Sequence, residues 1–151
     1  MPIQGYATRV DAGKTVGQIM ALLAKHGARA VHAVYEGEGL PAALSFIIAT
    51  SWGETEFRLP IRVAGVHAYL QRERDAGRID RDRYATRDHA INVAWRLCLE
   101  WLQVQLSLVE TEMVALDEIM LPFALVGEQR ISLHEAMVTH GMRLLLPQGG
   151  G

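Results

Sequence analysis

One stretch of this sequence, residues 87–110, constrains the fold more than any other, because it predicts a long helix that is apolar around most of its circumference. Thr86 is a suitable N-cap for it, and at 1.5 Å per residue the helix would be about 36 Å long. A domain of this size has a radius of gyration of roughly 15 Å, so the helix should cross the whole domain.

Polar side chains fill an arc of only about 120° when residues 87–110 are drawn as a helix. They are Asp88, His89, Asn92, Arg96, Glu100, Gln103, Ser107 and Glu110. The remaining surface is apolar and needs cover on two sides. Trp95 and Trp101 point about 120° apart and should pack against different neighbours. We expect one neighbour to be a β-sheet and the other to be a helix over 63–77 or a second subunit.

Three segments before residue 60 have the pattern of short β-strands. Residues 29–36 look extended, residues 42–50 are an apolar run of strand length, and residues 54–59 alternate between apolar and polar side chains. Turns rich in glycine and proline separate them, which is typical of an antiparallel meander. A further short strand is predicted over 6–10.

Helices are predicted on both sides of this meander. The first has Thr15 or Asp11 as its N-cap and ends at His26, where Gly27 supplies a left-handed residue. The fold class that follows is α+β, with a three- to four-stranded antiparallel meander packed on the first helix and on the long, largely apolar one.

The last third of the chain predicts a helical C-terminal lobe. A short helix over about 112–120 precedes a small hairpin around Gly127 and Glu128. Ser132 and Glu135 have the spacing of a capping box and should open the last helix.

Length and composition indicate one domain. We expect residues 1–147 to form a single α+β domain and residues 148–151 to be a disordered glycine tail. The most apolar stretch, residues 90–109, carries Arg96 and Glu100, which are too costly inside lipid. The N-terminus lacks the pattern of a signal peptide. We therefore expect no membrane association and a cytoplasmic location in a bacterial host cell.

No catalytic, cofactor or metal motif stands out. Residues 12–15, with the sequence AGKT, resemble part of a phosphate loop, but Thr8 stands where that motif needs glycine. The six histidines lack the spacing of metal ligands. Cys98 lies on the apolar arc of the long helix, as a small buried hydrophobe does. We assign no catalytic residue, metal or cofactor, and leave an enzymatic role open.

Arginine is concentrated in the middle of the chain. Residues 57–97 hold nine arginines against five acidic residues, whereas residues 98–151 hold two against seven. The planar guanidinium group suits phosphate, which it binds by paired charge-assisted hydrogen bonds. The candidate nucleic-acid-binding residues are Arg58, Arg62, Arg72, Arg74, Arg78, Arg81, Arg83 and Arg87. In the alternative interpretation, these arginines pair with the acidic residues interleaved among them on solvated helix faces.

Several motifs occur in an order that identifies a resemblance. They are YATRV, LLAKHGA, an apolar strand followed by FRLP, AWRLCLEWLQVQLSLVE, LDEIMLPFALVGEQRISLHEAM and a final LLLP. In this order and spacing the chain resembles a family of small accessory proteins encoded by bacteriophages and prophages. The family usually has lysine where this chain has Gln103 and Gln105. The resemblance implies a phage-related accessory protein and carries no established active site.

These observations favour a non-catalytic, phage-related nucleic-acid-binding accessory protein in DNA metabolism or recombination. A host protein is the alternative partner, for an inhibitor of a host polymerase or defence system. A sponge for a small anionic signalling nucleotide is a third possibility. The apolar excess of the long helix predicts a homo-oligomer, with an interface formed by Trp95, Trp101, Leu102 and Leu108.

Overall fold

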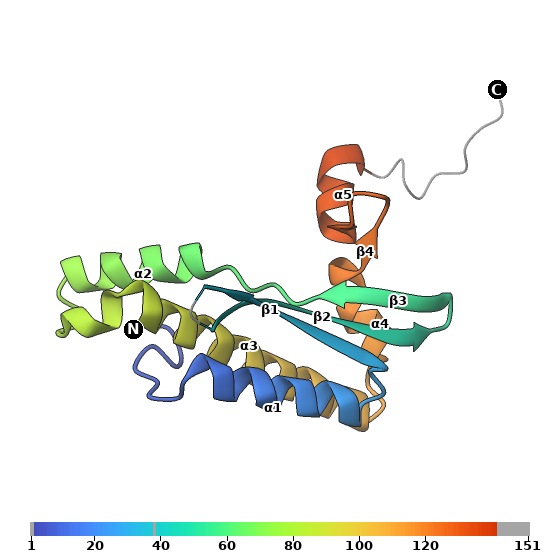
Figure 1. Cartoon of the computed structure of the whole chain (residues 1–151), viewed down its shortest axis with the longest axis horizontal. Coiled ribbons are helices and arrows are strands. Elements are labelled where there is room, and N and C mark those ends of the chain that lie inside the picture. The colour runs from blue at the N-terminus through green and yellow to red at the C-terminus, as the bar shows by residue number, and fades with distance from the viewer. Residues whose placement is uncertain (1, 38, 142–151) are drawn as a thin grey trace.

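A computed structural model describes residues 2–37 and 39–141 and shows an α+β architecture (Figure 1). A three-stranded antiparallel meander packs against α1 and α3, and a small lobe follows at the C-terminal end. The fold class predicted from the sequence is confirmed. The glycine tail predicted over 148–151, and the predicted end of the domain at residue 147, lie outside the described residues.

The sheet has the order β1-β2-β3, with β1 at Ala30–Glu36, β2 at Leu40–Thr50 and β3 at Gly53–Arg58. Phe46 of β2 lies opposite Phe57 of β3, and their stacked rings have centroids 5.5 Å apart. Both rings are fully buried on the face that α1 and α3 cover. The alternation along residues 54–59 is therefore the inward and outward alternation of a half-buried strand.

The strand predicted over 6–10 is wrong, because this segment forms turns that lie along α3. Gln4 donates to Glu100 at 2.5 Å, and the Tyr6 carbonyl hydrogen bonds to the ring of His89. Gly5 has φ 75°, a conformation that glycine adopts without steric cost. The polar arc of α3 is thus partly covered by the N-terminal segment and is not simply solvated.

The long helix α3 spans Arg87–Glu110, as predicted. The Thr86 side chain caps it by accepting from the backbone N–H of His89 at 3.2 Å. Trp95 is 0% exposed, and its indole N–H donates to the Pro41 carbonyl of β2 at 3.0 Å. This contact fixes α3 against the sheet.

Helix α1 spans Ala12–Lys25 and begins after Asp11, whose carboxylate accepts from the N–H of Gly13 at 3.0 Å. Of the two N-caps considered, Asp11 is therefore the correct one. The N–H of Ala12 donates to the side chain of Asn92 at 2.9 Å, which ties the start of α1 to α3. Helices α1 and α3 then lie side by side under the sheet (Figure 1).

Helix α2 spans Val63–Asp75 and packs on α3. It therefore covers part of the second apolar side of that helix, the side that does not face the sheet. Their contact forms a second small core around Leu70, Ile79, Ala90 and Val93. A short 3-10 helix, η1 (Asp82–Ala85), leads from α2 into α3.

The C-terminal lobe combines short helices with a two-stranded sheet. Its elements are α4 (Leu116–Met120), the 3-10 helix η2 (Leu121–Phe123), β4 (Leu125–Val126), β5 (Ile131–Ser132) and α5 (Leu133–His140). The capping of α5 is confirmed, since the Ser132 hydroxyl accepts from the N–H of Glu135 at 3.1 Å. The helix predicted over about 112–120 begins only at Leu116. Glu112 has φ 60°, and such a left-handed residue ends a helical run.

Among the described residues, no helix combines the length and the apolar character needed to cross a bilayer.

Replacing Trp95 by phenylalanine should destabilise the protein by about 2–4 kcal/mol, because it leaves a cavity and removes the buried hydrogen bond to the Pro41 carbonyl. Trp52→Phe is the matched control, since Trp52 is 54% exposed and should change stability by less than about 0.5 kcal/mol. Urea unfolding followed by circular dichroism measures both. Equal losses in the two variants would contradict the anchoring role of Trp95.

Candidate functional site

The structure does not gather the eight predicted arginines on one surface. Three of them are held in ion pairs, in line with the alternative interpretation of the sequence. The pairs are Arg74–Asp75 at 3.3 Å, Arg78–Glu73 at 2.5 Å and Arg87–Glu36 at 2.8 Å. These guanidinium groups are less available to an anionic partner than unpaired ones.

The Arg78–Glu73 pair has a structural role. The backbone carbonyl of Glu73 accepts from the N–H groups of Arg78 and Ile79. These hydrogen bonds hold the turn that follows the C-terminal end of α2. Its carboxylate is almost fully buried, and the hydrogen bond from Arg78 holds the pKa of Glu73 below its usual value. The pair therefore stabilises the end of α2.

Arg58 and Arg62 lie near the start of α2 and line a hollow of about 200 Å³ that also contains Ser132 and Glu135. The 13 residues of α2 separate this place from η1, a length of about 20 Å. Arg72 is exposed on α2 and has no ion pair with a described residue.

Arg83 and Arg9 line one hollow together with Tyr84, and the charge of Arg81 also acts on the Tyr84 hydroxyl. Arg83 donates to that hydroxyl at 3.0 Å, and its guanidinium carbon lies 4.9 Å from the Tyr84 ring centroid. The hydrogen bond from Arg83 lowers the pKa of Tyr84, and the charges of all three arginines act in the same direction. None of the three forms an ion pair with a carboxylate in the described part of the chain.

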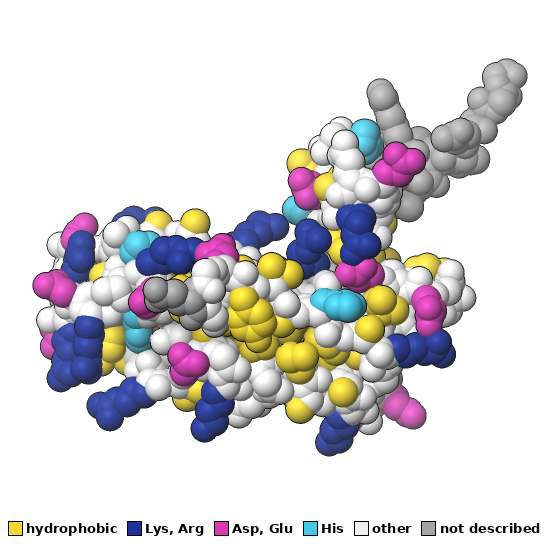
Figure 2. Space-filling model, in the orientation of Figure 1, with side chains coloured by type: hydrophobic (Ala, Val, Ile, Leu, Met, Phe, Trp, Pro, Cys, Tyr) yellow, Lys and Arg dark blue, Asp and Glu magenta, His cyan; other side chains and the backbone are white. Residues whose placement is uncertain are grey.

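A hollow of about 270 Å³ opens at this place, and we call it the basic pocket. It is lined by Thr8, Arg9, Arg83, Tyr84 and His89. Figure 2 shows dark blue side chains at the end of the molecule where α2 turns back toward α3, with magenta ones among them. The local field is therefore mixed, and the unpaired arginines supply its positive part.

The Tyr84 ring organises the basic pocket by contacts on several sides. It packs edge-on against Tyr6 with centroids 5.8 Å apart, and it lies 5.0 Å from the His89 ring. With the Arg83 guanidinium also over the ring, little free aromatic surface remains for a base to stack on. The pocket is suited to an anionic group such as phosphate.

Sequence reasoning missed Arg9, Thr8 and His89. Arg9 reaches the basic pocket because the N-terminal segment docks on α3, where the Tyr6 carbonyl meets the His89 ring. No local pattern indicates a contact between segments about eighty residues apart. His89 stands in the polar arc of the predicted helix, which marked it only as a surface residue.

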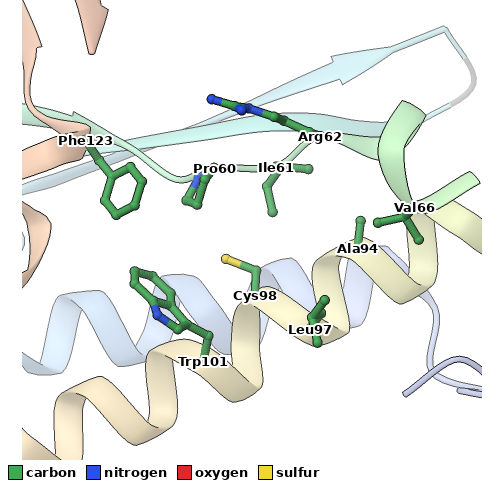
Figure 3. Close-up of a pocket in the computed structure, with 9 residues that line it drawn as sticks. All are labelled: Pro60, Ile61, Arg62, Val66, Ala94, Leu97, Cys98, Trp101 and Phe123. Atoms are coloured by element: carbon green, nitrogen blue, oxygen red, sulfur yellow. The ribbon is translucent and has the colours of Figure 1, made fainter. Parts of the chain in front are cut away.

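A second feature, which we call the apolar groove, lies on another part of α3 (Figure 3). It has a volume of about 460 Å³ and is lined by Pro60, Ile61, Arg62, Val66, Ala94, Leu97, Cys98, Trp101 and Phe123. Trp101 and Phe123 meet edge to face with centroids 5.8 Å apart. The groove therefore lies between α2 and the C-terminal lobe, under the linker that follows β3.

The predicted oligomer interface needs correction. Trp95 and Leu102 are fully buried inside one subunit, because their side of α3 faces the sheet and α1. They have no surface to offer to another copy. Trp101 and Leu108 are half-buried, and the exposed apolar side chains of α3 are Leu97 and Val104, which the sequence did not distinguish.

The described residues contain no group of three or more His, Cys, Asp or Glu side chains placed to hold a metal ion. Cys98 is the only cysteine, and Figure 3 shows its sulfur in the apolar groove. Burial raises the pKa of this thiol to about 12, so it is protonated at neutral pH.

Cys98 should therefore react slowly with a disulfide reagent such as DTNB. At pH 8 a thiol of pKa about 12 has roughly a thousandth of the thiolate of an ordinary cysteine. We expect at least a hundredfold slower labelling in the folded protein than in 6 M guanidinium chloride. Comparable rates would show that the thiol is not held in an apolar environment.

Comparison of the chain with models of protein families, with curated proteins and with solved structures finds no match. The basic pocket brings together charged groups from distant segments, so it is a stronger candidate for a functional site than the apolar groove.

Proposed function

We propose that this protein is a nucleic-acid-binding accessory protein, of the phage-related kind that the resemblance implies, with a role in DNA metabolism or recombination. The observation that carries the proposal is the pair of arginines, Arg9 and Arg83, that line the basic pocket beside Tyr84, with Arg81 close enough for its charge to act on the Tyr84 hydroxyl. Arg9, Arg81 and Arg83 have no carboxylate partner among the described residues, whereas Arg74, Arg78 and Arg87 do.

Phosphate is the group that fits this arrangement. A guanidinium fork can donate two parallel hydrogen bonds to a phosphate, and two such groups, those of Arg9 and Arg83, line the basic pocket. Thr8 and His89 add polar groups to the same pocket. Because the faces of Tyr84 are occupied, we expect the contacts to go to the sugar–phosphate backbone, which makes binding largely independent of base sequence.

The overall charge limits the strength of this interaction. The chain carries a formal net charge of −2, so long-range attraction to nucleic acid is weak. Binding then depends on the few local contacts. About three phosphate contacts give a slope of log K against log salt of about −3 for duplex DNA.

Arg83→Gln and Arg9→Gln should each weaken DNA binding about tenfold at low salt, because each removes a charge-assisted contact with phosphate. Arg74→Gln is the matched control, since it removes the same charge from an arginine already paired with Asp75. We expect it to weaken binding less than twofold. Fluorescence anisotropy with labelled oligonucleotides measures all three. Absence of binding to DNA or RNA by the wild-type protein at 20 mM salt would overturn the proposal.

The salt dependence provides a second measurement. The Arg83→Gln variant should have a log–log salt slope smaller in magnitude by about 1 than the wild-type slope, because one phosphate contact is lost. Two duplexes of unrelated sequence should give slopes and affinities that agree within a factor of about three. A marked preference for one sequence would contradict backbone recognition.

A protein partner is the second candidate, as in an inhibitor of a host polymerase or defence system. The specific observation that favours it is the apolar groove, one of whose lining side chains, Leu97, is exposed. The third candidate is a sponge for a small signalling nucleotide, because the basic pocket, at about 270 Å³, has the size for a few phosphate groups. Competition of such nucleotides against bound DNA separates this third possibility from the first.

A further inference from the structure

The basic pocket is a hollow formed by side chains from three separate segments. Thr8 and Arg9 belong to the N-terminal segment, Arg83 and Tyr84 to η1, and His89 to the first turn of α3. Figure 1 shows the N-terminal segment beside the end of α3 at which this helix begins. Among the described residues that line the pocket, none is an aspartate or a glutamate. A hollow of this kind receives a group that projects into it, whereas the middle of a continuous chain would lie across it.

Several hydrogen-bond donors in the pocket remain available to a ligand. The Thr8 hydroxyl accepts from the N–H of Val10 at 3.2 Å, and the Tyr84 hydroxyl accepts from Arg83 at 3.0 Å. Each hydroxyl therefore keeps its own proton for a further acceptor. The guanidinium group of Arg9 has no hydrogen bond or ion pair within the described part of the chain. Together these groups suit a ligand with several acceptor oxygens at one place.

The ring of His89 adds a group that can share a proton with the ligand. Its Nε2 hydrogen bonds to the Tyr6 carbonyl, and because a carbonyl only accepts, Nε2 carries a proton. Its Nδ1 has no partner among the described residues. A phosphate monoester ionises a second time near pH 6, so it can offer Nδ1 either a P–OH or a negative oxygen. A phosphodiester has no P–OH and can satisfy Nδ1 only when that nitrogen is protonated.

We infer that the basic pocket binds the terminal phosphate of a nucleic-acid strand, which is a phosphate monoester. This inference rests on the proposed nucleic-acid-binding function and names the part of the strand that the pocket receives. A terminal phosphate has three free oxygens and a charge of about −1.5 to −2, against two free oxygens and a single charge for a backbone phosphodiester. It therefore gains more from the two guanidinium groups of Arg9 and Arg83.

The end of a strand accounts for the site better than a free mononucleotide does. The Tyr84 ring already contacts Tyr6, His89 and the Arg83 guanidinium, so a nucleotide base finds little aromatic surface on which to stack. A free nucleotide would then be held through its phosphate alone. Arg81 does not line the pocket, but its charge acts on Tyr84. It remains available to the backbone that adjoins a bound strand end.

The test compares oligonucleotides of about 12 nucleotides, labelled on an internal base, that end in a 5′-phosphate, in a 3′-phosphate or in hydroxyl groups alone. Fluorescence anisotropy at low salt should show that at least one phosphorylated form binds about tenfold more tightly than the hydroxyl form. A hydroxyl-ended oligonucleotide that is two nucleotides longer adds a similar charge without a monoester. We expect that control to bind less than about twofold more tightly than the shorter one.

The preference for a phosphorylated end should fall below about twofold in Arg83→Gln and in Arg9→Gln. Arg74→Gln is the matched control, because Arg74 is paired with Asp75, and it should keep the preference. Circular dichroism melting shows that the three variants are folded. A preference that survives in both pocket variants would contradict the assignment to this site.

Equal binding of the phosphorylated and hydroxyl forms would overturn this inference while the proposed function stands. Absence of binding to every oligonucleotide would overturn both. The source of the monoester is tested by competition with thymidine 5′-monophosphate. A free nucleotide that competes as strongly as the phosphorylated oligonucleotide would overturn the assignment to strand ends, whereas a competitor weaker by at least about tenfold supports it.

Discussion

The hydrogen bond from the Trp95 indole to the Pro41 carbonyl joins the two layers of the protein. It lies in a fully buried position, so it fixes the rotation of α3 about its own axis as well as its distance from the sheet. That rotation decides which apolar side chains face the sheet and α1. It also decides that Leu97 and Val104 point elsewhere. A small turn of the helix would exchange buried and exposed positions.

The polar arc of α3 is used as a docking site within the chain. Asn92 accepts from the N–H of Ala12, Glu100 accepts from Gln4, and the His89 ring meets the Tyr6 carbonyl. These contacts order the N-terminal segment and carry Arg9 to Tyr84. The basic pocket therefore depends on the hydrogen bonds made by the polar arc of α3. His89 is on α3 itself, and the segments that contribute the other residues of the pocket pack on that helix.

Sequence patterns predicted the elements of the fold better than their partners. The cap at Thr86 and the alternation over residues 54–59 depend on local chemistry, and the structure agrees with both. The strand expected over 6–10 failed because short apolar runs do not reveal whether a neighbouring strand or a helix will receive them. Charge counting likewise found arginines but could not tell paired from unpaired ones, since Arg87 pairs with Glu36 from a distant strand. The groove depends on a gap between α2 and the lobe, which no periodicity encodes.

The unbroken course of α3 sets a length scale for the molecule. The basic pocket lies at its first turn and the apolar groove lies along its middle, so one unbroken helix joins the two features without a hinge. Between His89 in the pocket and Cys98 in the groove the helix rises about 14 Å. A molecule bound in one feature would therefore stand at a nearly constant distance from a molecule bound in the other.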